Sequence, residues 1–192
     1  MGPRGGNDMN IFVRFAVAIA VFGTFSACAK IDPTNEPQRD MDEFRLGHNV
    51  VIAKNATPGP LTRSIEKEEI GVALRAAVDE RLGAYSGTRL LHVGVAVDAY
   101  VLALPGLPTV LSPKSVLALT VNIWDNATQQ KLNEEPRRFT VFERTTAATI
   151  VGSGLTQTKD MQLQNLSRNA ALKIQNWILE HPDWISPVVE GE

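Results

Sequence analysis

Alternating apolar and polar residues dominate the middle of the chain. Between residues 89 and 103 every second position is apolar, and His92, Asp98 and Tyr100 share the opposite phase. This pattern predicts a long strand with one buried face that bends or bulges, and Gly94 is a candidate position for it. Residues 116–124 alternate in the same way. The residues expected on the core side of these two strands are Leu91, Val93, Val95, Val97, Ala99, Val101, Ala103, Leu117, Leu119, Val121 and Ile123.

Three further segments complete the predicted sheet. The apolar run of residues 44–53 predicts a first strand. Residues 131–142 predict a strand that returns antiparallel, and Pro136 interrupts its pairing. Residues 149–151 predict a short additional strand.

Apolar residues at helical spacing predict two helices, over residues 65–82 and 161–181. Gly83 and Pro182 are placed to end them. Two amphipathic helices pack most simply on one face of an antiparallel sheet. We therefore expect one α+β domain over residues 44–185, in two layers. Its sheet has about four strands, its order is β-α-β-β-β-α, and residues 186–192 form a tail.

The N-terminal segment predicts export. Positive charges at Arg4 and Arg14 precede an uncharged apolar run over residues 15–25. Such a run has the length of a signal-peptide core and is shorter than the roughly 20 residues of a membrane-spanning helix. Met1 and Met9 are both possible start sites. We expect residues 1–27 to be a signal peptide, followed by Cys28, the only cysteine of the chain.

Phe25-Ser26-Ala27-Cys28 resembles the lipobox of bacterial lipoproteins, with Phe25 where the usual residue is Leu. The resemblance implies cleavage before Cys28 and attachment of fatty acyl chains such as palmitate. Residues 28–43 then form the lipidated cysteine and a flexible tether. Because Ala29 is not Asp, the resemblance favours the periplasmic face of the outer membrane. An inner-membrane anchor and a secreted periplasmic protein are the alternatives.

The whole pattern from Cys28 onward is similar to small alphaproteobacterial lipoproteins of an uncharacterised family. It is also similar in architecture to the lipopolysaccharide-assembly lipoprotein of the outer-membrane translocon and to auxiliary lipoproteins of envelope ABC transporters. These resemblances imply binding of partners or lipids without catalysis. Cys28 is the one functional residue that they carry over.

Composition and spacing argue against several other functions. The net charge is −2, with no basic run to neutralise a row of phosphates, so nucleic acid is not an expected partner. One cysteine permits no internal disulfide and no four-cysteine zinc site. His48, His92 and His181 lack the spacing of a metal motif, and Gly152-Ser153-Gly154 lacks that of a phosphate loop. We therefore expect no catalytic residue, metal site or cofactor, and no enzyme.

The segment of residues 104–113 is the candidate contact site. It is uncharged and carries three prolines together with Leu104, Leu107, Val110 and Leu111. Either it docks a partner protein, a lipid or the bilayer, or it folds back as a lid over the core. The leading hypothesis is an accessory or assembly factor that binds an envelope protein complex. The alternative is a carrier that holds a lipid or other apolar ligand between helices and sheet.

Overall fold

The computed structural model describes residues 37, 39–41, 43–104, 115–143 and 158–187, together with Gly2. The chain divides after Ile31, and every described helix and strand belongs to the second unit, Asp32–Glu192. Residues 105–114 and 149–151, for which sequence-based predictions were made, lie outside the described residues.

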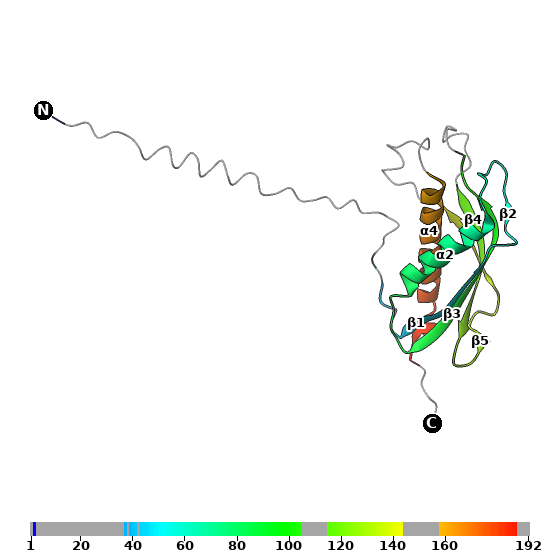
Figure 1. Ribbon diagram of the computed structural model, residues 1–192. Helices are drawn as coiled ribbons and strands as arrows, with labels where there is room; N and C mark the ends of the chain where they lie inside the picture. Colours follow the sequence, from blue (N-terminus) through cyan, green and yellow to red (C-terminus); the bar gives the residue numbers. More distant parts are fainter. Residues whose placement is uncertain are drawn as a thin grey trace, which may run out of the picture. The chain divides into compact units, whose positions relative to one another are not determined.

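Four long strands form the sheet, in the spatial order β1-β3-β4-β6 (Figure 1). Two strands of two residues extend it, because β2 pairs with β3 and β5 pairs with β4. The break between β5 and β6 includes Pro136, as predicted. The strands are β1 (Phe44–Ile52), β2 (Thr57–Pro58), β3 (Arg89–Val101), β4 (Val116–Asp125), β5 (Gln130–Lys131) and β6 (Arg137–Phe142).

Two helices cover one face of this sheet, which confirms the two-layer α+β prediction (Figure 1). Helix α2 spans Lys67–Leu82 and ends at Gly83, whose N–H donates to the carbonyl of Asp79 at 2.9 Å. Helix α4 spans Lys159–Leu179, and the short α5 follows at Pro182–Ile185.

The direction of β1 corrects the prediction of a fully antiparallel sheet. β1 and β3 pair in parallel, with Val51 opposite Val95. The helix between them in the sequence explains the pairing, because α2 carries the chain back so that β3 runs the same way as β1. The pairs of β3 with β4 and of β4 with β6 are antiparallel, as expected.

A bulge in β3 corrects the predicted alternation. Val97 pairs with Leu119 and Ala99 with Ala118, so Asp98 is an extra residue on β3. An extra residue reverses the side on which later side chains lie. The predicted core residues Ala99, Val101 and Ala103 are accordingly only half-buried, whereas Tyr100 and Leu102 are buried. The strand therefore bulges as predicted, but at Asp98, since the candidate position Gly94 pairs regularly with Asn122.

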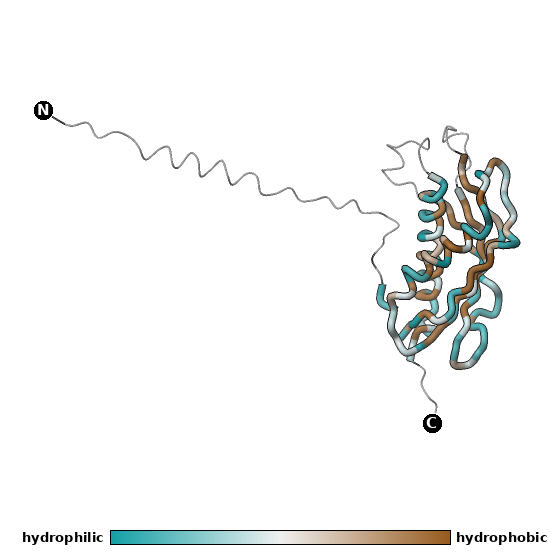
Figure 2. The backbone as a smooth tube through the Cα atoms, in the orientation of Figure 1, coloured by the Kyte–Doolittle hydropathy of each residue, from teal (hydrophilic) through white to brown (hydrophobic). Residues whose placement is uncertain are grey.

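Apolar residues of both layers form one buried core between helices and sheet. Figure 2 shows hydrophobic residues along the strands and along the helices. The predicted core positions of β4 are all buried, as are Leu91, Val93, Val95 and Val97 on β3. The helices contribute most of the remaining side chains, namely Ile70, Leu74, Ala77, Val78, Leu82, Leu163, Leu166, Ala170, Ile174 and Trp177.

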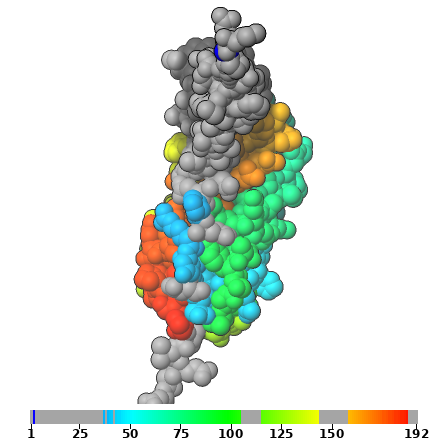
Figure 3. Space-filling view, turned by 90° about the vertical axis from the view of Figure 1, so that its left-hand side faces the viewer, coloured from blue at the N-terminus to red at the C-terminus, as the bar shows by residue number. Residues whose placement is uncertain are grey.

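The start of β1 forms part of one side of the domain (Figure 3). It lies beside α5, where the N–H of Glu43 donates to the carbonyl of Ile185 at 3.2 Å. On its other side, the N–H of Gly87 donates to the carbonyl of Phe44 at 3.0 Å. Met41, within the predicted tether, is also fully buried in this core.

Candidate binding groove

Most of the predicted site residues lie outside the described residues. These are Cys28, Leu107, Val110 and Leu111. Leu104 is described and is half-buried just after β3. The N–H of its neighbour Ala103 donates to Ser115 Oγ at 3.1 Å. The residues that flank the 104–113 segment therefore lie next to each other. Whether this segment is a lid or a docking site stays a prediction.

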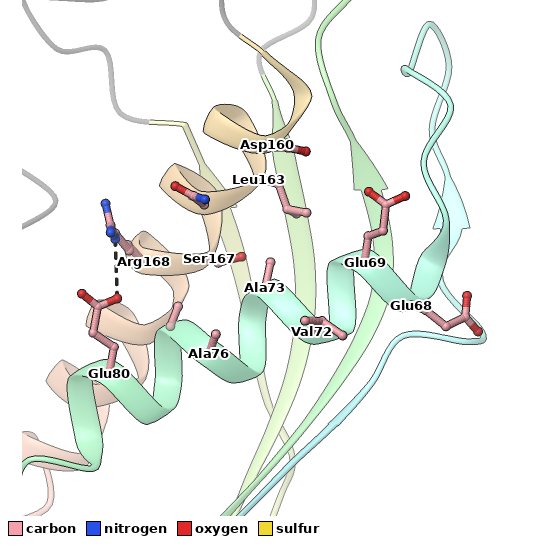
Figure 4. Close-up of a pocket in the computed structure, with 12 residues that line it drawn as sticks. Glu68, Glu69, Val72, Ala73, Ala76, Glu80, Asp160, Leu163, Ser167 and Arg168 are labelled. Atoms are coloured by element: carbon pink, nitrogen blue, oxygen red, sulfur yellow. Dashed lines mark ion pairs between the residues drawn. The ribbon is translucent and has the colours of Figure 1, made fainter.

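A hollow lies between α2 and α4, on the outer side of the helix layer, and was not predicted from the sequence. It has a volume of about 570 Å³ and is open to solvent (Figure 4). Ala73, Ala76 and Ala77 on α2 create it, because short side chains leave space where longer ones would meet α4. That run of alanines was the available signal in the sequence. The lining residues, called the α2–α4 groove below, are Glu68, Glu69, Val72, Ala73, Ala76, Ala77, Glu80, Asp160, Leu163, Gln164, Ser167 and Arg168.

Ser167 places an unsatisfied hydroxyl at the floor of this groove. The residue is fully buried, and its Oγ has no hydrogen-bond partner among the described residues. Figure 4 shows Ser167 directed toward Ala73 on the facing helix. A buried polar group left without a hydrogen bond costs about 1–3 kcal/mol.

Two ion pairs frame the groove. Lys159 Nζ lies 2.6 Å from Glu69 Oε2, and Arg168 Nε lies 3.7 Å from Glu80 Oε2. The hydrogen bond between Lys159 and Glu69 lowers the pKa of Glu69 and raises the pKa of Lys159. All four side chains are at least one-third exposed, so these pairs add little stability.

The rim of the groove carries an excess of negative charge. Glu68 and Asp160 also line it, and neither forms a salt bridge with a described basic residue. With two carboxylates beyond those in the ion pairs, the rim favours a cationic occupant. The alanine floor lets such an occupant approach the helix backbones closely.

His48 and His92 meet although 44 residues separate them, which the sequence did not predict. Gly47 and His48 together oppose His92 in a second bulge, and the two imidazole rings stack with centroids 4.8 Å apart. The backbone N–H of His48 donates to His92 Nδ1 at 2.8 Å, and His92 Nε2 lies 3.1 Å from Asn126 Oδ1. Because both ring nitrogens are occupied, His92 has a structural role.

His181 is also held by its neighbours, since its ring stacks on Trp184 with centroids 4.0 Å apart. Within the described ranges, no group of three His, Cys, Asp or Glu residues is arranged to hold a metal ion. Among the helices of the same ranges, none has the length and apolar character needed to cross a membrane.

Three solved structures of bacterial proteins have a low similarity to this chain. A Caulobacter crescentus protein inferred to be a lipoprotein has 12% identity and a TM-score of 0.37, covering 71% of this chain and 89% of that one. A Xanthomonas campestris protein matched by the family model DUF330 has 11% identity and a TM-score of 0.42, covering 75% and 90%. A minor lipoprotein from Acinetobacter baumannii has 16% identity and a TM-score of 0.30, covering 69% and 92%. No family model and no curated protein matches the sequence.

Proposed function

We propose that this protein is a lipid-anchored protein of the cell envelope that acts by binding another protein. The observation that carries the proposal is the position of Cys28, the only cysteine. It directly follows two small residues at the end of an uncharged apolar run. Several acyl chains on one cysteine anchor a protein durably, whereas a single chain binds marginally. Since Ala29 follows the cysteine, we propose the periplasmic face of the outer membrane as its location.

The α2–α4 groove is the proposed contact for the partner protein. Its occupant is a helix of that partner with a basic side chain and a small apolar face. The basic side chain pairs with Glu68 or Asp160, and the apolar face lies on the alanines of α2. This arrangement suits an accessory or assembly factor, which binds and positions another protein.

A carrier of an apolar ligand is the second candidate, favoured by the size of the groove. Small-molecule sites have volumes of about 300–1,000 Å³, and the groove falls in that range. Four carboxylates line it, however, and its open side would leave an apolar ligand exposed to water. The space between helices and sheet, where a carrier would hold its ligand, is occupied by core side chains. These features favour protein binding.

Cell fractionation tests the anchor. We expect the unmodified protein to fractionate with the outer membrane. The Cys28→Ser variant should remain in its uncleaved precursor form, and the Ala29→Asp variant should fractionate with the inner membrane. An inhibitor of lipoprotein signal peptidase should make the normal chain accumulate as precursor. Normal processing of Cys28→Ser, or of the inhibited chain, would contradict the proposal.

Site-directed photocrosslinking in intact cells tests the groove. A photoreactive residue in place of Val72, on the groove, should give one discrete protein adduct, and the same residue in place of Thr140, on the sheet, should not. Adding Glu68→Lys and Asp160→Lys should abolish the adduct while the protein stays folded. An adduct that survives both charge reversals would exclude the groove as the contact.

A further inference from the structure

The face of the sheet that the helices leave open carries a set of exposed apolar side chains. Val50 and Ile52 on β1, Trp124 on β4 and Phe142 on β6 are between 41% and 55% exposed. Their neighbours Val51, Ile123 and Val141 are buried under the helices, so the alternation of the strands directs all four outward. Exposed apolar residues gathered on one face indicate a surface that contacts another phase or molecule.

Small residues fill the middle of this open face. Gly94 and Ala96 on β3 pair with Asn122 and Thr120 on β4, and Ala118 lies one outward position further along β4. None of them has a long side chain, so the centre of the face is shallow. A shallow, broad surface fits another extended surface better than it fits a protruding helix.

The charges on the open face are mainly positive. Arg45, Lys131 and Arg138 lie at outward positions of β1, β5 and β6. Asp98 is the one acid at an outward position of the described strands, and it accepts a hydrogen bond from Thr120 Oγ1 at 2.7 Å. Aromatic side chains and long cations are the residues that lie at the interface between lipid headgroups and acyl chains.

We propose that the open face of the sheet docks on the surface of a bilayer that contains anionic lipid. Arg45, Lys131 and Arg138 contact the phosphates, while Trp124 and Phe142 enter the headgroup region. The inference rests on the proposed function in one respect, because the anchor at Cys28 keeps the domain beside a membrane. Because Met41 is buried in the core, the free tether comprises at most residues 29–40 and reaches no more than about 40 Å, so docking is effectively intramolecular. The α2–α4 groove, on the opposite layer, then faces away from the membrane.

Trp124 is a built-in reporter for this proposal. It is 41% exposed, whereas Trp177 and Trp184 are at most 6% exposed. Lipids brominated near the headgroup quench a tryptophan that lies among them. The native lipidated protein is reconstituted into brominated vesicles of phosphatidylcholine, alone or mixed with phosphatidylglycerol. Flotation first shows that the anchor holds the protein on both, so failure of the anchor is seen separately from failure to dock.

We expect strong quenching in the anionic vesicles, weak quenching in the neutral ones, and loss of the difference at high salt. Trp124→Phe should leave only the weak signal of the two buried tryptophans. Arg138→Glu should lower the ratio of docked to free domain at least about five-fold, the factor expected for one cation near an anionic surface.

A matched pair of variants separates the two layers. Phe142→Ser, on the open face, should reduce docking, and Val72→Ser, also more than half exposed but on the helix layer, should not. Equal quenching of anchored protein in neutral and anionic vesicles would overturn the proposal. Equal effects of Phe142→Ser and Val72→Ser on docking would also overturn it. So would protein that dimerises through the open face of the sheet and shows no difference in quenching between the two kinds of vesicle.

Discussion

Gly87 sits against the backbone of Glu43, where β1 meets the turn before β3. A Cβ atom at this position would overlap the carbonyl carbon and oxygen of Glu43. The backbone cannot move aside easily, because Gly87 N–H is bonded to the carbonyl of Phe44. We therefore expect Gly87→Ala to lower the free energy of unfolding by about 3 kcal/mol, measured by urea denaturation.

Gly94→Ala is the matched control for this substitution. The nearest atom to an added Cβ there is the carbonyl oxygen of Asn122 at 3.8 Å, an ordinary contact. Alanine also restricts the unfolded chain more than glycine does, so we expect an unchanged or slightly higher stability. Equal losses in the two variants would contradict the close approach at Gly87.

Glu43 gives the domain an acid-sensitive contact. Its carboxylate accepts hydrogen bonds from the Thr88 hydroxyl at 2.6 Å and the Thr88 N–H at 3.0 Å. These bonds lower the pKa of Glu43 below its ordinary value of 4.5. Because the folded pKa is below the unfolded one, the stabilisation is complete above the ordinary pKa and is lost as the pH falls through the folded pKa.

Unfolding midpoints measured from neutral pH down to about pH 3 check this assignment. Glu43→Gln should make the midpoint fall less steeply in the acid range than it does for the unmodified protein. Glu134→Gln, which changes an exposed carboxyl in the turn before β6, should keep the original slope. A Glu43→Gln profile parallel to the unmodified one would show that Thr88 does not hold the carboxylate in solution.

At the scale of elements, the bulge at Asp98 determines which of the side chains that follow it on the chain face the core. Deleting Asp98 should turn Tyr100 and Leu102 outward, at a cost of about 1.5–3 kcal/mol for each buried side chain. Asp98→Asn keeps the residue count and an acceptor for Thr120, so it should cost less than about 1 kcal/mol. Equal urea midpoints for the two variants would mean that the strand does not need the extra residue.

The same bulge shows why sequence patterns located the elements but not all their faces. Residues 99–103 are apolar in both phases, since Tyr100 and Leu102 alternate with Ala99 and Val101. Periodicity therefore could not reveal the reversal. Periodicity also carries no strand direction, and the parallel pairing of β1 and β3 follows instead from the helix that connects them. The α2–α4 groove depends on how two helices pack, although its alanines were visible in the sequence.

At the scale of the whole molecule, two layers give the domain two different outer faces. The helix layer carries the acidic groove, and the open sheet carries exposed apolar residues with cations. The described core is built from residues between Met41 and Ile185, thirteen or more positions beyond Cys28. Removing the acyl chains should therefore change location and leave the fold intact. Enzymatic deacylation should leave the thermal midpoint of the domain unchanged, and a marked fall would show that the lipid supports the fold.

The mass of the native protein tests the central claim most directly. Intact mass spectrometry of protein extracted from membranes should give a chain that begins at Cys28 and carries a diacylglyceryl group, with a further acyl chain on the amine. The N-terminal peptide should hold all of the added mass. A chain that begins elsewhere, or an unmodified thiol at Cys28, would contradict the lipid anchor.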